Sequence, residues 1–353
     1  MLRGAVVLAA AVLTLAVPAI KPAGAQVPDR TARVVTFADL AGWAEDDHGA
    51  ALEAFAATCG DLADREWAGI CAIARRTAPE DARGFFEALF RPVLIEDGVP
   101  GMFTGYFEPE LDGALRRTAI HRWPLYRLPP EVVPGTPFLT RAEIETTGAL
   151  AGRGLEIVWV DDPVEAFFLQ VQGSGRVRLP SGRVIRVGYG GKNGHEYRSV
   201  GMEMIRRGLM TEDEASAERI RDWVRENPEA GADLLRHNPS FVFFREVSEV
   251  PPERGPLGAM NRSVTPMRTI AVDPAFQPLG APVWIETEGR APMRRLMVAQ
   301  DTGSAIVGAQ RADIFFGTGQ LAGQAAGAVR DGGRMVTLLP IRMAYALAPD
   351  DVL

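Results

Sequence analysis

The stretch Val298-Ala-Gln-Asp-Thr-Gly-Ser-Ala-Ile-Val-Gly-Ala-Gln-Arg-Ala-Asp-Ile-Phe-Phe-Gly317 decides how this chain is interpreted. It places two aspartates, Asp301 and Asp313, among small and apolar residues with almost no compensating cations. Carboxyls that share an apolar site cannot all ionise cheaply, because burial and like charge both raise a carboxyl pKa. A carboxyl that keeps its proton near neutral pH can act as a general acid. Acid-catalysed bond cleavage is therefore the first hypothesis.

A third aspartate, Asp273, lies upstream in Ala271-Val-Asp-Pro-Ala-Phe-Gln-Pro-Leu-Gly280. Each of the three acids lies at the end or the start of a short apolar run that is typical of a β-strand. Strand ends in one small β-domain can converge on a single site. An aspartate in such a place also commonly bonds the backbone of a turn, so spacing alone leaves both interpretations open.

The composition is that of a soluble globular protein with one large domain or two ordinary ones. The chain has 353 residues, of which 47% are hydrophobic and 24% charged. Its formal net charge of −7 leaves no excess of basic side chains to neutralise phosphates, which argues against a nucleic-acid partner. The four histidines are scattered without metal-ligand spacing, so we expect neither a metal nor another cofactor.

The first 25 residues have the pattern of a secretory signal. Arg3 precedes the apolar run Ala5–Val17, and Ala23-Gly-Ala25 follows as a cleavage site. The run is too short for a comfortable membrane span, although an uncleaved anchor is the alternative. After export, Cys59 and Cys71 can form a disulfide that closes a short loop. A catalytic thiol is the other interpretation, but no histidine lies close in sequence.

The hydrophobic pattern predicts a mainly β protein with peripheral helices. Residues 26–100 are mostly helical, and short strands broken by Gly and Pro follow from about 102 to 187 and from 267 to 347. A polar helix is expected near 212–225. A second one, 320–330, carries glycines every four residues that would let it lie close on a sheet. Such short strands favour barrels or sandwiches over a parallel doubly wound sheet.

Three further stretches contain candidate ligand-binding residues. Gly105–Leu111 sets aromatic rings beside acids, a combination that suits sugar binding. Gln170 and Gln172 would share one face of an expected strand, 166–172. The glycine-rich loop 187–194 does not match the phosphate-loop pattern. Each stretch also has an ordinary structural interpretation, as a strand, a pair of exposed amides or a tight turn.

Taken together, these segments resemble the membrane-bound lytic murein transglycosylase A family over about residues 100–345. The stretches that match in order are Phe103–Glu110, Phe168–Gly175, Gly188–Gly194 with Tyr197, Asn238–Phe244 and the C-terminal aspartate block. That block resembles the three-aspartate domain, whose acids correspond to Asp273, Asp301 and Asp313. Thr302-Gly-Ser304 departs from it, being bulkier than the glycine pair expected there.

The resemblance implies two domains with a glycan groove between them. A double-psi β-barrel would be assembled from residues 26–104 and 241–353, and a second, β-barrel-like domain, 105–240, would be inserted into it. Around the groove, the family motifs imply ligand contacts from Thr104, Tyr106, Gln170, Gln172, Lys192 and Asn193. Glu108 is the weaker candidate, with a structural role as the alternative.

The resemblance also implies the reaction. The β-1,4 bond between N-acetylmuramic acid and N-acetylglucosamine would be cleaved without water, leaving a 1,6-anhydromuramoyl end. Asp313 would act as acid and then base, with Asp301 and Asp273 holding it. Peptidoglycan strands would be the substrate, with cell-wall synthesis or division proteins as further partners. The protein would be periplasmic, and any outer-membrane association would lack a lipid-bearing cysteine.

Two other functions stay open at this point. One is a true glycan hydrolase with Asp313 as acid and Asp301 as the base for water. The other is a non-catalytic murein-binding scaffold.

Overall fold

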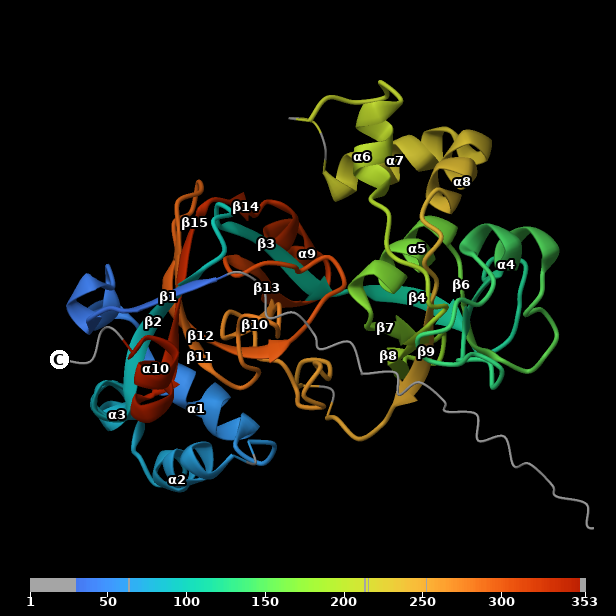
Figure 1. The fold of residues 1–353 in the computed structure, drawn as a ribbon. Coiled ribbons are helices and arrows are strands. Elements are labelled where there is room, and N and C mark those ends of the chain that lie inside the picture. Colours follow the sequence, from blue (N-terminus) through green and yellow to red (C-terminus); the bar gives the residue numbers. More distant parts are fainter. Residues whose placement is uncertain (1–29, 63, 213, 215, 252, 350–353) are drawn as a thin grey trace, which may run out of the picture.

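A computed structural model of the chain describes residues 30–349, apart from residues 63, 213, 215 and 252. Two β-sheets lie side by side, and helices cover their outer faces (Figure 1). The prediction of a mainly β protein with two β-rich domains and peripheral helices is confirmed. The expected signal segment lies outside the described residues. No helix within them has the length and apolarity that crossing a membrane requires.

The first domain is built on a nine-stranded sheet in the order β1-β2-β15-β11-β12-β10-β13-β3-β14. Most neighbours are antiparallel, but the pairs β10–β12 and β13–β3 are parallel. The strands are β1 Thr31–Val34, β2 Phe90–Glu96, β3 Met102–Glu108, β10 Thr269–Val272, β11 Pro282–Thr287, β12 Arg294–Asp301, β13 Arg311–Thr318, β14 Arg330–Asp331 and β15 Gly333–Pro340. Every residue of β11 is buried, because both faces of this central strand are covered.

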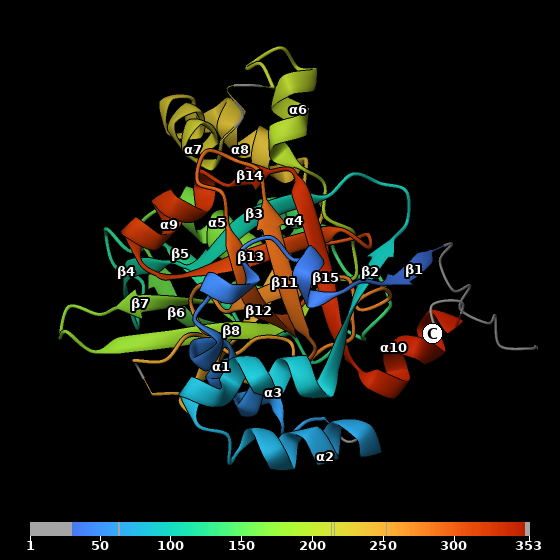
Figure 2. The same cartoon turned by 90° about the vertical axis from the view of Figure 1, so that its left-hand side faces the viewer.

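The N-terminal helices pack under this sheet, as Figure 2 shows from the side. They are α1 His48–Thr58, α2 Arg65–Ala74 and α3 Ala82–Leu89. A fourth helix, α10 Ile341–Leu347, comes from the C-terminal part of the chain. Phe55 and Phe86 of this layer share one apolar core with Trp284 of β11. A disulfide between Cys59 and Cys71 joins the end of α1 to α2. The expected helical N-terminal region is therefore present and covers one face of the sheet.

The second domain contains a six-stranded sheet in the order β5-β6-β4-β7-β8-β9. Its strands are β4 Glu110–Ala114, β5 Trp123–Tyr126, β6 Glu156–Val160, β7 Gly175–Arg178, β8 Val184–Lys192 and β9 Val242–Val247, and its helices are α4 Arg141–Thr147, α5 Pro163–Gln172, α6 Val200–Arg206, α7 Ala217–Glu226 and α8 Pro228–Arg236. The predicted hairpin around 180–182 is confirmed, since β7 and β8 pair antiparallel. The chain enters this sheet directly after β3 and leaves it after β9, at Val247, later than the boundary expected at 240.

The prediction of a strand over 166–172 is wrong, because these residues belong to helix α5. Asp162 caps the helix by accepting a hydrogen bond from Val164 N, and Pro163 occupies its first turn. Gly173 ends it with φ of 80°, a conformation that favours glycine. These three signals outweigh the apolar run between them, which by itself fits a buried helix as well as a strand.

Helix α9, Gln320–Gly327, lies close on strand β3, as its glycine spacing predicts. A Cβ at Gly323 would lie 2.7 Å from the ring of Phe107, and one at Gly105 would lie 2.7 Å from Cα of Ala326. Both glycines are therefore required by the close approach of helix and strand. This packing holds β3 in place close to the point where the chain passes from β3 into β4 of the second domain.

At the junction of the two domains, Glu108 ends β3 with its side chain completely buried. Its carboxylate accepts hydrogen bonds from Nε of Arg176 at 2.8 Å, from Nε of Arg186 at 2.8 Å and from Oγ1 of Thr318 at 2.8 Å. The arginines come from the six-stranded sheet and the threonine from the nine-stranded sheet. We call Glu108, Arg176, Arg186 and Thr318 the junction cluster, and infer that it fixes how the two sheets meet.

Candidate active site

Four neighbouring strands of the nine-stranded sheet place one residue each in a single row. Ala271 of β10 is the register partner of Asp301 on β12 and of Asp313 on β13, and Asp313 in turn pairs with Thr104 on β3. Because neighbouring strands lie about 4.8 Å apart, the two aspartate backbones are about 10 Å apart with one strand between them. The small side chain of Ala271 leaves space between the carboxyls. The expected convergence of Asp301 and Asp313 thus follows from the register.

A register shift in β12 directs Asp301 into the cleft. The parallel pairing with β10 passes from Ile270–Ala299 to Ala271–Asp301, so Gln300 is the extra residue of a bulge. Gln300 is fully buried on the opposite side, where its Nε2 donates to the carbonyl of Ala54 in α1. The bulge therefore separates a core amide from the neighbouring cleft carboxyl.

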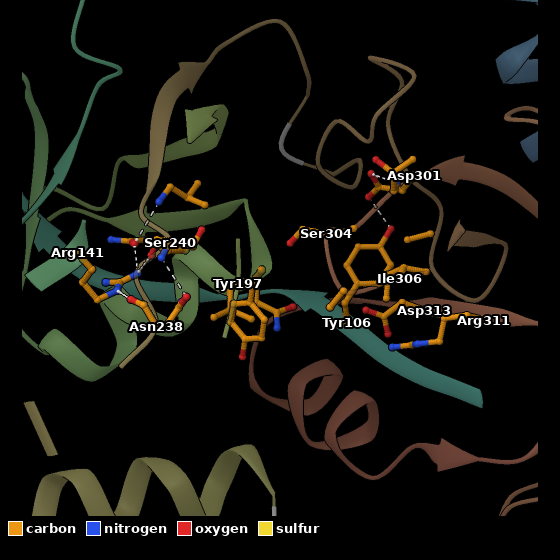
Figure 3. Close-up of a pocket in the computed structure, with 18 residues that line it drawn as sticks. Tyr106, Arg141, Tyr197, Asn238, Ser240, Asp301, Ser304, Ile306, Arg311 and Asp313 are labelled. Carbon is orange, nitrogen blue, oxygen red and sulfur yellow. Dashed lines mark hydrogen bonds between the residues drawn. The ribbon is translucent and has the colours of Figure 1, made fainter. Parts of the chain in front are cut away.

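Both aspartates line a cleft of about 240 Å³ to which the two domains contribute (Figure 3). From the nine-stranded side come Tyr106, Ala271, Asp301, Thr302, Gly303, Ser304, Ala305, Ile306, Arg311 and Asp313, and from the other side Arg141, Gln170, Val171, Gln172, Tyr197, Asn238, Ser240 and Val242. The bulkier Thr302-Gly-Ser304 segment thus lies at the cleft. Polar and aromatic side chains face the space from both sides, as binding of a polar ligand such as a sugar requires.

Asp301 uses both carboxyl oxygens as acceptors. Oδ2 accepts from the hydroxyl of Tyr106 at 2.9 Å, and Oδ1 accepts from the backbone N of Ala259 and of Thr302, each at 2.9 Å. Burial raises the pKa of Asp301 to about 6 and the charge of Asp313 adds to the rise, while these three donors oppose it because they stabilise the charged form. Burial of the Tyr106 hydroxyl, together with the neighbouring Asp301 carboxylate, raises the pKa of Tyr106 well above its ordinary value.

Asp313 is bonded on one oxygen only. Its Oδ1 accepts from Oγ1 of Thr104 at 2.6 Å, and the described residues offer no hydrogen-bond donor to Oδ2. Burial raises the pKa of Asp313, opposed by the Thr104 hydrogen bond and by the charge of Arg311. Three donors stabilise ionised Asp301 and a single hydroxyl stabilises Asp313. By the number of donors alone, Asp301 is the better stabilised anion of the two.

Arg311 corrects the expectation of a stretch almost without compensating cations. It lies two residues before Asp313 on β13, so both side chains point to the same face of the strand. Its Nη2 donates to Oγ1 of Thr104 at 2.8 Å, and its charge lowers the pKa of Asp313. The alternation of side chains along the strand was the signal that could have identified it.

The structure does not bring Asp273 to the cleft. Its Oδ1 accepts from the backbone N of Ala275 at 3.0 Å and its Oδ2 from the backbone N of Gly308 at 2.9 Å. It does not line the cleft, and both oxygens bind turn backbone, which was the structural interpretation of an aspartate at a strand end.

Gln170 and Gln172 reach the cleft, but not on one face as expected. Residues two apart on a helix point about 200° apart, and the two amides have different partners. Oε1 of Gln170 accepts from Nη2 of buried Arg141 at 2.6 Å, whereas Oε1 of Gln172 accepts from the backbone N of Phe107 at 3.1 Å. Gln172 therefore links the two domains beside the cleft, at β3.

Lys192 and Asn193 lie outside the cleft lining. Asn193 is fully buried: its Nδ2 donates to the carbonyls of Leu139 and Pro239, and its Oδ1 accepts from the backbone N of Phe241. Its amide thus cross-links loops of the second domain. Lys192, at the end of β8, is exposed.

Outside the 302–304 segment, five polar or charged lining residues were not among the predicted candidates: Arg141, Tyr197, Asn238, Ser240 and Arg311. Arg141 is held by the carbonyls of Asn238 and Ser240, in loops far from it in sequence, which no local pattern indicates. Among the described residues, no group of three or more His, Cys, Asp and Glu side chains could hold a metal ion.

Comparisons with known proteins find relatives of both domains. The MltA specific insert domain matches residues 102–245, and the 3D domain matches residues 268–339. The membrane-bound lytic murein transglycosylase A of Vibrio cholerae is 35% identical over 263 residues, which cover 70% of this chain and 69% of that protein. The Escherichia coli K12 protein of the same name is 34% identical over 247 residues, 67% of this chain and 65% of that protein.

Solved structures are similar over most of the chain. The membrane-bound lytic murein transglycosylase of Agrobacterium tumefaciens has a TM-score of 0.80 at 33% identity, over 90% of this chain and 99% of that one. Escherichia coli MltA with bound chitohexaose has a TM-score of 0.69 at 29% identity, over 83% of this chain and 90% of that one.

Proposed function

The chain belongs to the membrane-bound lytic murein transglycosylase A family and is a peptidoglycan lytic transglycosylase, and we propose that Asp313 is its acid–base residue. The observation that carries the assignment is the unequal hydrogen bonding of the two cleft carboxyls. Asp301 accepts three hydrogen bonds and Asp313 one. The carboxyl that keeps its proton in the resting enzyme is then Asp313.

The proposed reaction uses that carboxyl twice, first as an acid and then as a base. Oδ2 of Asp313 donates its proton to the glycosidic oxygen as the bond from C1 of the muramoyl sugar breaks with oxocarbenium character. The C6 hydroxyl oxygen of the same sugar then bonds to C1, and the proton of that hydroxyl passes to the Asp313 carboxylate. Atoms balance without water, because the attacking hydroxyl belongs to the substrate. One carboxyl suffices, since an intramolecular nucleophile is already oriented.

In this scheme Asp301 is the charged partner. Its negative charge favours the proton on Asp313 and the positive charge that develops at C1. Tyr106 supports it by donating to Oδ2 at 2.9 Å. The two carboxyls are kept apart because strand β10 lies between their backbones. Among the described atoms, Asp301 makes no hydrogen bond to Asp313.

The substrate class follows from the family and from the cleft. Escherichia coli MltA, a relative, has been solved with chitohexaose, a chain of β-1,4-linked sugars. Here the cleft presents Tyr106 and Tyr197 with the amides of Gln170 and Gln172. We propose that glycan strands of peptidoglycan lie between the domains and that the enzyme acts in the periplasm after export.

Analysis of products tests this function against a two-carboxylate hydrolase. Purified murein is digested with the protein, and the released muropeptides are analysed by mass spectrometry. We expect 1,6-anhydromuramoyl ends, which are lighter by one water than reducing ends. Release of reducing ends alone would refute the proposal in favour of hydrolysis. No release under conditions in which the protein binds murein would support a scaffold instead.

A further inference from the structure

The hydroxyl of Thr104 has two partners, and only one arrangement of its proton satisfies both. Its Oγ1 lies 2.8 Å from Nη2 of Arg311 and 2.6 Å from Oδ1 of Asp313. A guanidinium donates hydrogen bonds and cannot accept them. Thr104 must therefore accept from Arg311, and its own proton must point to Asp313.

Because Thr104 donates to it, Oδ1 of Asp313 is an acceptor in both protonation states. The carbonyl oxygen of a neutral carboxyl is a better acceptor than its hydroxyl oxygen, so the hydrogen bond from Thr104 favours the proton on Oδ2 over Oδ1. Asp313 lines the cleft, and among the described residues its hydrogen bond is made by Oδ1 and not by Oδ2. The arrangement thus favours the proton on the oxygen that has no protein partner there.

We propose that Arg311 is a positioning residue which, through the hydroxyl of Thr104, directs the proton of Asp313 to Oδ2. This inference rests on the proposed acid–base role of Asp313 and goes beyond it, since it assigns the donating oxygen and the residue that selects it. Without the fixed donor at Arg311, the Thr104 hydroxyl can rotate and accept from Asp313, so the neutral carboxyl can hold its proton on the wrong oxygen.

The guanidinium is held firmly enough for this role. Its Nη1 donates to the carbonyl of Ala312 at 2.5 Å and to that of Met102 at 3.4 Å, which ties it to both β13 and β3. The groups that face Asp313 are Thr104 and Tyr106 from β3, Arg311 from its own strand β13 and Asp301 from β12. Arg311 is the only cation that acts on Asp313 among the described residues.

The test uses the variants Arg311→Met and Thr104→Val in the full-length protein, assayed for anhydro-muropeptide release across pH. Arg311→Met removes the guanidinium that fixes the Thr104 hydroxyl, and Thr104→Val removes the hydroxyl that donates to Oδ1 of Asp313. We expect kcat to fall about tenfold, as loss of a charge-assisted hydrogen bond does. We also expect the alkaline limb of the profile to move to higher pH, because both groups lower the pKa of Asp313. Activity needs the protonated acid, so a higher pKa extends activity to higher pH.

Conservative variants separate positioning from packing. Lysine also only donates, and serine keeps the hydroxyl, so Arg311→Lys and Thr104→Ser should recover most of kcat and restore the limb. Arg330→Met is the matched control, because Arg330 pairs with Thr104 in the sheet but forms an exposed ion pair with Glu212. It should leave kcat and both limbs unchanged.

Two failures can be told apart. If Asp313→Asn is inactive while Arg311→Met and Thr104→Val keep the wild-type kcat and pH profile, the positioning role is refuted and the acid–base role stands. If Asp313→Asn is fully active, the proposed function itself is refuted. A fall in kcat with an unmoved limb and no rescue by the conservative variants indicates packing only and also overturns the positioning role.

Discussion

The junction cluster and the cleft bury carboxyls in opposite ways. At the junction, Glu108 accepts hydrogen bonds from Arg176, Arg186 and Thr318. In the cleft, burial raises the pKa of both Asp301 and Asp313, and Arg311 reaches Asp313 only through the hydroxyl of Thr104 among the described contacts. The difference teaches that a buried carboxyl bonded by two guanidiniums can hold two sheets together. One without them can take up and release a proton.

The largest effect should come from Asp313→Asn, which removes the proton carrier and keeps the shape. We expect lysis of murein to fall about 10³-fold, as for an essential acid–base group. Binding of chitohexaose, measured by calorimetry, should stay within about threefold of wild type. Lysis at the wild-type rate would show that the Asp313 carboxyl in the cleft has no catalytic role.

Glu108→Ala tests the other side of the comparison. It leaves two arginines without their buried partner, so the free energy of unfolding should fall by about 3 kcal/mol in urea denaturation. Glu110→Ala is the matched control, since Glu110 pairs with Arg178, a largely exposed arginine. Its effect should be about 0.5 kcal/mol or less. Equal effects of the two variants would contradict a structural role for the junction cluster.

Tyr106→Phe sharpens the comparison within the cleft. It removes one of three donors that stabilise charged Asp301, so the pKa of Asp301 should rise above about 6. The proposed scheme needs Asp301 ionised, so activity is lost as pH falls through that pKa. The acid limb of kcat/KM should therefore move to higher pH, with kcat about tenfold lower. An unchanged acid limb would exclude Asp301 as the charged partner.

The smallest effect is expected for Lys192→Met. The family motif implies a ligand contact here, but the side chain is exposed and outside the cleft lining. We expect kcat and KM for murein within about twofold of wild type. A KM several times higher would place the glycan farther along the second domain than the cleft residues indicate.

Patterns that are local in sequence predicted much of this fold. The strands around Asp301 and Asp313, the hairpin at 180–182 and the close packing of α9 follow from alternation, turns and glycine spacing. Helix α5 was mistaken for a strand because its apolar run hides the helical period. Its cap residue Asp162 and the following Pro163 carried the better signal.

The candidate site was predictable only in part, since its details depend on register and on distant loops. The bulge that turns Asp301 into the cleft appears only when β12 pairs with β10. Asp273 was grouped with the other acids because it also ends a strand, yet its oxygens bind turn backbone. Arg141 and the loops at 238–240 meet only in three dimensions.

The central claim is that Asp313 holds a proton in the resting cleft. The direct measurement is a pH titration of aspartate side-chain carboxyls by carbon NMR in the wild-type protein, with Asp313→Asn to assign the signal. The account predicts that Asp313 titrates well above the ordinary aspartate value and stays substantially protonated at the pH of activity. A carboxyl already fully ionised at that pH, both free and with chitohexaose bound, would contradict it.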